Sequence, residues 1–172
     1  LFVAIFVRVR VWEPDQSLLG FRLLSQQVTD KVQARLRAQE AFLVQLRASF
    51  GSPQGLSRQD FTNLAQEPLR RLAGIQAIEW APRVDAAQRD AFEAAQRREV
   101  ADFAIRDRAA ADGLRRAGNR PEFYPLTYLE PLPANQPVLG FDLASEPIRR
   151  AAILETVASN AVTASAPISL LQ

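Results

Sequence analysis

The chain has 172 residues, of which 48% are hydrophobic and 23% are charged, a composition typical of a folded globular protein. It contains no histidine, cysteine or methionine. These absences exclude catalytic units built on imidazole or thiol groups, zinc sites with thiolate or imidazole ligands, haem ligation by these residues, and disulfides, whereas carboxylate-only chemistry remains possible. The 21 basic residues nearly balance the 19 acidic ones, so the charge gives little reason to expect a nucleic-acid partner.

The first thirteen residues begin with a short apolar run, LFVAIFV, at positions 1–7. A membrane-spanning helix needs roughly 20 apolar residues, so this run cannot cross a bilayer by itself. It is either the end of a transmembrane segment or a short strand, because VRVRV alternates with period two. We favour the end of a transmembrane segment, since no turn or partner strand follows. The chain also begins without Met, and we therefore expect a fragment or a processed chain.

Residues 14–50 predict one long stalk helix that opens at Pro14. Apolar residues recur every three or four positions from Leu18 to Phe50, which is the period of one helix face. At about 1.5 Å per residue this helix would be on the order of 50 Å long, more than a compact domain of this size requires. Such a rod usually links domains or dimerises, so we expect a homodimer through the stalk helix. The segment GSPQG at 51–55 is expected to end it.

The remaining residues, 51–172, predict an α+β domain. The expected elements are a helix at 57–74, strands at 75–80 and 103–105, a helix at 85–100, a Gly- and Arg-rich loop up to 121, strands at 123–129 and 138–143 around a proline-rich loop, a helix at 145–158, and a strand at 161–171. Ser57 with Asp60 forms a capping box, Asp85 and Ser145 are candidate N-caps, and Asn160 is a candidate left-handed C-cap. This order favours an antiparallel sheet that holds helices on one side.

Five sequence blocks carry a resemblance to a known family. They are EWAPRV at 79–84, the acidic-basic helix that begins at Asp85 and contains Arg89 and Phe92-Glu93, YPLTYLEP at 124–131, LGFDLAS at 139–145, and the Arg-Arg helix that follows. In this order and spacing the chain resembles a CHASE domain from about Phe61 to Gln172. CHASE domains are extracytoplasmic sensor modules of membrane-bound histidine kinases, diguanylate cyclases and phosphodiesterases. They also form the ligand-binding region of plant cytokinin receptors.

The resemblance implies a membrane-distal, PAS-like sensor subdomain at 51–172 behind the stalk helix. It implies a full-length protein anchored in the bacterial cytoplasmic membrane, with this domain on the periplasmic side. The implied partner is an unknown small-molecule ligand, and neither a cofactor nor a metal is expected. In the family another strand and a second subdomain follow the SLLQ-like block. We therefore expect the subdomain to be incomplete at its C-terminal end or to leave an exposed sheet edge.

The resemblance also points to ligand-binding residues. In the plant receptors one aspartate of an LDMMS-like block accepts hydrogen bonds from the ligand, and the matching residue here is Asp142. A carboxylate in a mostly apolar pocket would orient a ligand. Asp142 is equally a candidate for bonding nearby backbone amides at a strand end. Ala164 lies where the plant receptors carry a leucine against the ligand, which implies a wider pocket or a different ligand.

Three residues of the YPLTYLEP block are further candidates. Tyr124, Leu126 and Tyr128 fall on one face of their strand by period-two counting, so all three would line the same pocket. Core packing is the better interpretation for Leu126.

Glu79 and Trp80 allow two interpretations. Trp80 is either a stacking platform for a ligand, with Glu79 as a polar contact, or a residue that packs the sheet against a helix while Arg83 pairs locally. We favour the second interpretation.

The sequence does not predict an enzyme. Carboxylate pairs such as Asp90 with Glu93 are common on ordinary surfaces, and no Gly-rich phosphate loop or nucleophile elbow accompanies them. Any kinase, diguanylate cyclase or phosphodiesterase activity would belong to a cytoplasmic domain of a longer protein. Two hypotheses therefore remain: a ligand-binding sensor that relays occupancy through the stalk helix, or a structural dimerisation module without a physiological ligand.

Overall fold

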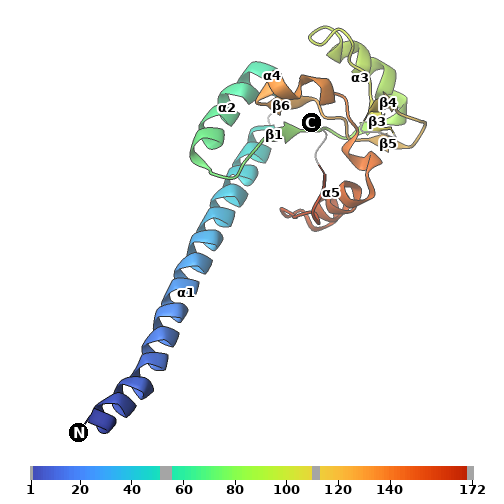
Figure 1. The fold of residues 1–172 in the computed structure, drawn as a ribbon. Coiled ribbons are helices and arrows are strands. Elements are labelled where there is room, and N and C mark those ends of the chain that lie inside the picture. The colour runs from blue at the N-terminus through green and yellow to red at the C-terminus, as the bar shows by residue number, and fades with distance from the viewer. Residues whose placement is uncertain (1, 51–55, 110–112, 170–172) are drawn as a thin grey trace. The chain divides into compact units, whose positions relative to one another are not determined.

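The structure of the protein is a computed structural model, which describes residues 2–50, 56–109 and 113–169, with side chains from Leu18 onward except at Ala134. The chain divides into two compact units, Leu1–Phe42 and Leu43–Gln172. Helix α1, Phe2–Phe50, makes up the described part of the first unit and ends inside the second (Figure 1). The expected helix terminator at 51–55 lies outside the described residues.

Helix α1 confirms the long N-terminal helix but starts earlier than Pro14. The VRVRV segment is helical, so the alternative of a short strand there is wrong. Helix geometry satisfies the backbone of this segment internally, whereas a strand would need a partner. Many large apolar side chains of α1 between Leu18 and Val44 are exposed. Among the described residues, no helix has the length and apolarity to cross a membrane.

The second unit mixes short helices with short antiparallel strand pairs, in agreement with an α+β fold (Figure 1). Its elements in chain order are α2 (Arg58–Arg71), β1 (Ile78–Trp80), β2 (Val84–Asp85), the 3-10 turn η1 (Ala86–Gln88), α3 (Arg89–Gln96), β3 (Arg106–Arg108), β4 (Leu114–Arg116), β5 (Glu122–Phe123), β6 (Tyr128–Glu130), α4 (Leu132–Asn135), η3 (Gln136–Val138), η4 (Leu143–Ser145) and α5 (Pro147–Ser159).

The strand pairs are nested along the chain. The outer pair is β1 with β6, the next is β2 with β5, and the inner pair is β3 with β4, all antiparallel. Each pair therefore encloses the next one in sequence.

The segment 140–143 joins these pairs. On one side the amide of Arg106 donates to the Gly140 carbonyl (2.9 Å) and the amide of Asp142 donates to the Arg106 carbonyl (2.8 Å). On the other side the amide of Gly140 donates to Leu126 (2.7 Å) and the amide of Leu126 donates to Phe141 (2.8 Å). The strand expected at 138–143 is thus hydrogen-bonded on both sides. Only single bridges form, because the 3-10 turns η3 and η4 close on it from each end.

Gly140 is required for this central position. Its φ is +84°, and a Cβ atom there would lie 2.1 Å from the backbone oxygen of Ala104. Only glycine combines this left-handed conformation with so close a backbone approach. The glycine thereby lets the segment 140–143 enter between its neighbours, which places Asp142 inside the molecule.

Helix α3 covers the two apolar clusters of the core. Phe92 of this helix packs against both clusters and meets the Phe103 ring edge-on, with 6.0 Å between ring centroids. One cluster contains Val84, Ile105, Ala117 and Phe123, and the other contains Phe103, Leu126, Leu129 and Leu139.

The end of α1 packs on the β1–β6 pair through aromatic rings. Trp80 and Tyr128 are cross-strand partners, and Phe50 stacks on Trp80 with 3.5 Å between centroids and 6° between planes. Phe61 of α2 lies 5.6 Å from the Tyr128 ring. The interpretation of Trp80 as a packing residue is confirmed, and Arg83 pairs locally with Asp85 (2.8 Å) as expected.

Some predicted caps are confirmed and others are wrong. The Ser57–Asp60 capping box forms, Pro147 opens α5, and Asn160 adopts the left-handed conformation with φ of 56°. Asp85 makes no capping hydrogen bond, because its carboxylate pairs with Arg83. Ser145 is not the N-cap of α5, because Glu146 takes that position.

Several helix and strand boundaries also differ from the predictions. The first helix of the domain ends at Arg71, the next strand begins at Ile78, and the helix expected at 85–100 is a 3-10 turn followed by α3. The strand expected at 103–105 lies at 106–108, because Phe103 and Ile105 enter the core instead. The strand expected at 123–129 is split into β5 and β6. Residues 161–169 of the last predicted strand form none, and 170–172 lie outside the described residues.

Candidate functional site

Asp142 is the central polar residue of the domain. Its side chain has no solvent exposure, because the segment 140–143 is flanked on both sides. Its Oδ1 accepts hydrogen bonds from the amides of Tyr124 (2.7 Å) and Ala144 (3.1 Å). Its Oδ2 lies 2.7 Å from Nη2 of Arg120 in an ion pair. The alternative in which Asp142 bonds nearby backbone amides is therefore confirmed.

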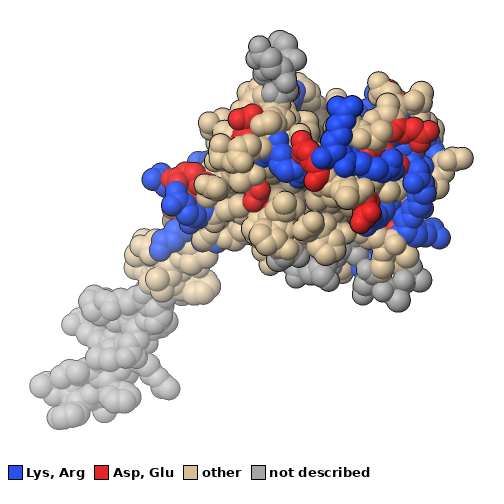
Figure 2. Space-filling view, turned by 90° about the horizontal axis from the view of Figure 1, so that it is seen from above, with Lys and Arg blue, Asp and Glu red and all other residues tan. Residues whose placement is uncertain are grey.

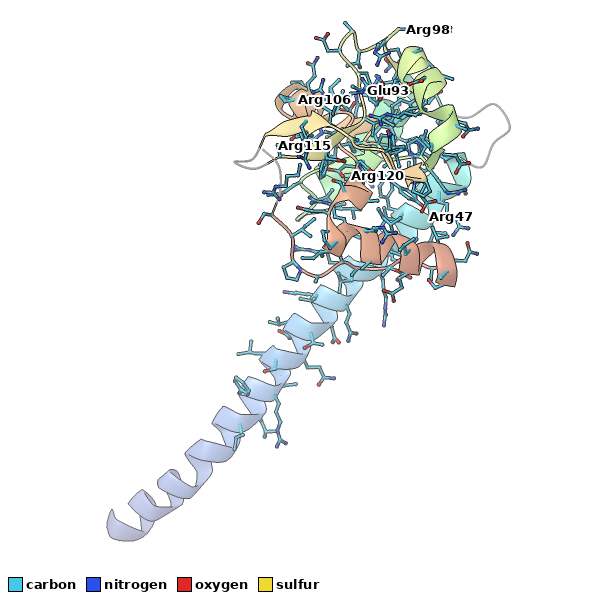
Figure 3. The ribbon with its side chains drawn as sticks, turned by 90° about the vertical axis from the view of Figure 1, so that its right-hand side faces the viewer. Arg47, Glu93, Arg98, Arg106, Arg115 and Arg120 are labelled. Atoms are coloured by element: carbon cyan, nitrogen blue, oxygen red, sulfur yellow. The ribbon has the colours of Figure 1, made fainter. Side chains whose placement is uncertain are left out.

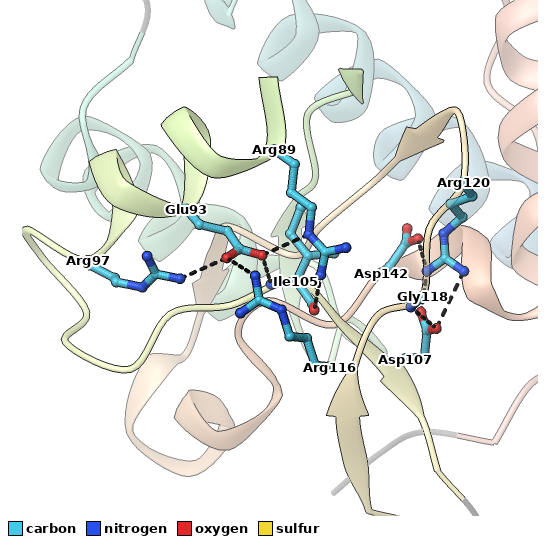
Figure 4. A network of polar contacts seen from close by, with 9 residues as sticks. All are labelled: Arg89, Glu93, Arg97, Ile105, Asp107, Arg116, Gly118, Arg120 and Asp142. Atoms are coloured by element: carbon cyan, nitrogen blue, oxygen red, sulfur yellow. Dashed lines mark hydrogen bonds and ion pairs between the residues drawn. The ribbon is translucent and has the colours of Figure 1, made fainter. Parts of the chain in front are cut away.

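Arg120 joins Asp142 to a second carboxylate. The same Nη2 atom pairs with Oδ1 of Asp107, whose Oδ2 accepts a hydrogen bond from the amide of Gly118 (3.3 Å) (Figure 4). The guanidinium also lies 5.0 Å from the centroid of the Phe123 ring. One cation thus holds two largely buried carboxylates, and this arrangement ties the segment 140–143 to β3.

The other predicted ligand contacts do not gather around Asp142. Tyr124 reaches it through its backbone amide, and Leu126 lies in the apolar core. Tyr128 belongs to the aromatic cluster at the end of α1, where its hydroxyl donates to the Leu56 carbonyl (3.3 Å). The backbone at 124–127 is not a regular strand, so the period-two alternation does not hold across the three residues.

Ala164 lies neither at Asp142 nor in the aromatic cluster at the end of α1. It lines a hollow of about 360 Å³ beside α5, together with Ile148, Ala152 and Glu155. The structure therefore brings together Asp142 and Tyr124 among the predicted site residues. It places Leu126, Tyr128 and Ala164 in three other surroundings.

Glu93 is a third buried carboxylate, which the sequence analysis had treated as an ordinary surface residue. It is 1% exposed and lies within ion-pair distance of Arg89 (3.1 Å), Arg97 (2.7 Å) and Arg116 (3.0 Å) (Figure 4). The amide of Ile105 also donates to it (3.0 Å). Arg89, Glu93 and Arg97 are spaced four residues apart, and this helical spacing was a visible signal. Nothing local in the sequence indicated Arg116 or Ile105.

Glu79 differs from these three buried carboxylates because it is solvent-exposed. Desolvation of the carboxylate by the surrounding protein raises the pKa of Glu79, and the positive charge of Arg149 partly offsets this rise. Water still reaches the carboxylate, so solvent screening keeps the energetic consequence small. Glu79 is thus an accessible acidic group on β1 rather than part of a buried network.

A larger hollow, of about 520 Å³, lies between the turn after α3 and the segment that contains α4 and η3. Asp102 and Arg106 line it, and so do the buried side chains of Phe103 and Leu139. It thus combines charged groups of both signs with apolar residues.

On the face that Figure 2 shows, basic and acidic side chains lie side by side, so this face does not carry charges of a single sign. Among the described residues, no group of three or more acidic side chains is arranged to hold a metal ion.

Comparison with known families identifies the domain. The family model of the CHASE domain matches residues 54–172, which is more than half of the chain. A comparison with curated protein sequences gives no match. The matched region contains all the strands, both hollows and the Asp142 network. The chain therefore belongs to the CHASE family, whose members are sensor domains of signalling proteins.

Proposed function

We propose that this chain is the periplasmic, small-molecule-binding sensor domain of a bacterial membrane-bound signalling protein. Family membership supports a sensor domain. The observation that carries the proposal is the stacking of Phe50, at the end of α1, on Trp80 of β1. This contact joins the long helix directly to the sheet of the domain. The proposed fold is PAS-like, an assignment supported by the hydrogen-bonded segment 140–143 between β3 and residues 124–126.

A second contact couples the end of α1 to the end of α5. Nη1 of Arg47 donates to the backbone carbonyl of Asn160 (3.2 Å), and Nη2 donates to its side-chain oxygen (2.5 Å). A ligand that prefers one arrangement of the sheet and α5 would therefore also favour one position of the helix end. Only such a difference in affinity can shift the equilibrium between two signalling states.

The exposed apolar side chains of α1 support a homodimer as the signalling unit. Those that share a face are Leu18, Phe21, Leu24, Val28, Val32, Leu36 and Leu43. At 100° per residue they fall within about one third of the helix circumference. Such a stripe fits the same stripe of a second copy, because apolar stripes of this width are the seams along which helices pair.

We expect Val32→Glu to convert a dimer of the chain into a monomer. The charge would be placed in the middle of the apolar stripe, where pairing would bury it without a partner. Light scattering would report a mass of about twice 19.1 kDa for the parent chain and 19.1 kDa for the variant. Ala34→Glu, an apolar-to-acid change on the opposite face of α1, is the matched control and should stay dimeric. Pairing through the stripe would be refuted if the parent chain were a monomer, or if Val32→Glu and Ala34→Glu disrupted the dimer equally.

The sensor function itself is tested by thermal unfolding in the presence of a broad small-molecule library. A ligand that binds only the folded state stabilises it by about 2.7 kcal/mol at a hundred times its dissociation constant. At least one compound should raise the unfolding temperature in a saturable way. If none does, the sensor proposal fails.

One observation favours the alternative of a structural dimerisation module without a ligand. Asp142 is engaged by Arg120 and by two backbone amides, and Leu126 is packed in the core, so both have structural roles that need no ligand. A stable dimer that responds to no compound in the library would support this alternative.

A further inference from the structure

The hollow of about 520 Å³ beside the turn after α3 contains two opposite charges that do not pair with each other. They belong to Asp102 and Arg106, which lie on its wall. Nη2 of Arg106 donates to the backbone carbonyl of Asp102 (2.8 Å), so the guanidinium lies at the main chain of that residue. Among the described residues, no hydrogen bond or ion pair engages the Asp102 carboxylate, and no carboxylate engages Arg106. Both charges are therefore free to meet a ligand.

The third charged side chain of the wall is already neutralised. Oε2 of Glu99 lies 2.9 Å from Nε of Arg58 in α2. The net charge that the hollow presents thus comes from Asp102 and Arg106, one of each sign.

Arg106 also has an unfavourable neighbour. It faces Arg116 across the β3–β4 ladder, and like charges directly opposite each other destabilise a strand pair. Glu93 offsets the charge of Arg116, at 3.0 Å. In the described part of the chain no hydrogen bond or ion pair joins Glu93 to Arg106, and Figure 3 labels the two residues apart from each other. An anionic group from outside would compensate the charge that the fold leaves on Arg106.

The accessible apolar surface of the hollow comes from Val100, Pro133 and Pro137, which line it and are half-buried or exposed. Phe103 is 1% exposed and Leu139 is 4% exposed, so these two side chains belong to the core beneath the hollow. Proline restricts the backbone at positions 133 and 137. A hydrocarbon group that enters the hollow would thus meet apolar surface at Val100 and the two prolines.

We propose that this hollow binds a zwitterionic α-amino acid with an apolar side chain. The carboxylate of the amino acid pairs with Arg106, its ammonium pairs with Asp102, and its side chain lies against Val100, Pro133 and Pro137. Charge-assisted hydrogen bonds of this kind are stronger than neutral ones, and an arginine fork suits a carboxylate. This inference rests on the proposed sensor function and names a ligand class for it.

The test is isothermal titration calorimetry of the full chain with L-leucine and L-phenylalanine, and with two analogues of leucine that each lack one charge. These are 4-methylpentanoate, which lacks the ammonium group, and 3-methylbutylamine, which lacks the carboxylate. We expect at least one amino acid to bind, and each analogue to bind roughly tenfold or more weakly than leucine. If 4-methylpentanoate bound as tightly as leucine, the ammonium group would not contribute and the proposal of a zwitterionic ligand would be refuted.

Two variants test whether the amino acid binds in this hollow. Arg106→Gln and Asp102→Asn should each weaken amino-acid binding roughly tenfold or more. Arg115→Gln and Asp90→Asn, exposed changes of the same kind outside the hollow, should leave it unchanged. Unfolding temperatures of the free variants show that they fold. If neither Arg106→Gln nor Asp102→Asn weakened amino-acid binding, the assignment of the binding site to this hollow would be refuted.

The failure of this inference is distinguishable from the failure of the sensor proposal. If neither amino acid binds but another compound of the library stabilises the chain, the sensor function stands and the ligand class proposed here is wrong. If no compound stabilises the chain, the sensor proposal and the proposed ligand class are both refuted.

Discussion

Asp142→Ala is expected to lower the free energy of unfolding by about 3–5 kcal/mol, the usual cost of removing one partner of a buried ion pair. Asp142 is fully buried and pairs with Arg120 at 2.7 Å. Its loss leaves the amides of Tyr124 and Ala144 without an acceptor in the interior. It also leaves the guanidinium with Asp107 as its only remaining carboxylate among the described residues.

Urea denaturation of the variant and of the parent chain measures this loss. Asp30→Ala is the matched control, because Asp30 is an exposed aspartate on α1, and its removal should change the unfolding free energy by less than about 0.5 kcal/mol. A loss below about 1 kcal/mol for Asp142→Ala would show that the pair with Arg120 contributes little. A large loss also means that Asp142→Ala cannot by itself reveal a ligand contact, since it perturbs the fold first.

Glu93→Gln is expected to cost about 2–3 kcal/mol at neutral pH, less than the loss of Asp142. The amide keeps an oxygen for the Ile105 backbone but loses the charge that three arginines share. The side chains of Arg97 and Arg116 are 41% and 60% exposed, so solvent screens their part of the interaction. The ion pair with Arg89, whose side chain is only 11% exposed, is screened least, so its loss contributes most to the destabilisation.

The same variant tests the pH dependence of stability. Burial raises the pKa of Glu93, but the Ile105 hydrogen bond, Arg89 and Arg116 more than offset this and hold it below the ordinary 4.5. Because the folded-state pKa is lowered, the stabilisation is fully present above pH 4.5 and is lost as the pH falls through the folded-state pKa. Denaturation curves from about pH 6 down to about pH 3 should therefore show a steeper acid loss in the parent chain than in Glu93→Gln. Parallel curves would contradict the role of Glu93.

The features that sequence predicted well depend on near neighbours. The stalk helix follows from its own periodicity, the Ser57–Asp60 box from a three-residue spacing, and the C-cap from the tolerance of Asn160 for the left-handed region. A cap prediction failed where an ion pair took the same carboxylate. Asp85 pairs with Arg83 instead of with a helix N-terminus.

The features that sequence did not predict depend on distant residues. The inner pair β3–β4 has the sequence character of a charged loop, because Arg106, Asp107 and Arg116 lack the apolar alternation of a strand. Asp142 was identified through the family resemblance, whereas its partner Arg120 lies 22 positions away and nothing local marks it. The hollow at Asp102 and Arg106 is formed by segments more than 25 residues apart, which no spacing rule connects.

The nested order of the strand pairs has a consequence for folding kinetics. Pairing β3 with β4 first brings β2 and β5 near each other, and pairing β2 with β5 then brings β1 and β6 together. Each step then closes a short effective loop, which costs less chain entropy than joining β1 to β6 directly. Pulse-labelling hydrogen exchange should find the β3–β4 amides protected no later than those of β1–β6. The opposite order would mean that the outer aromatic cluster nucleates folding.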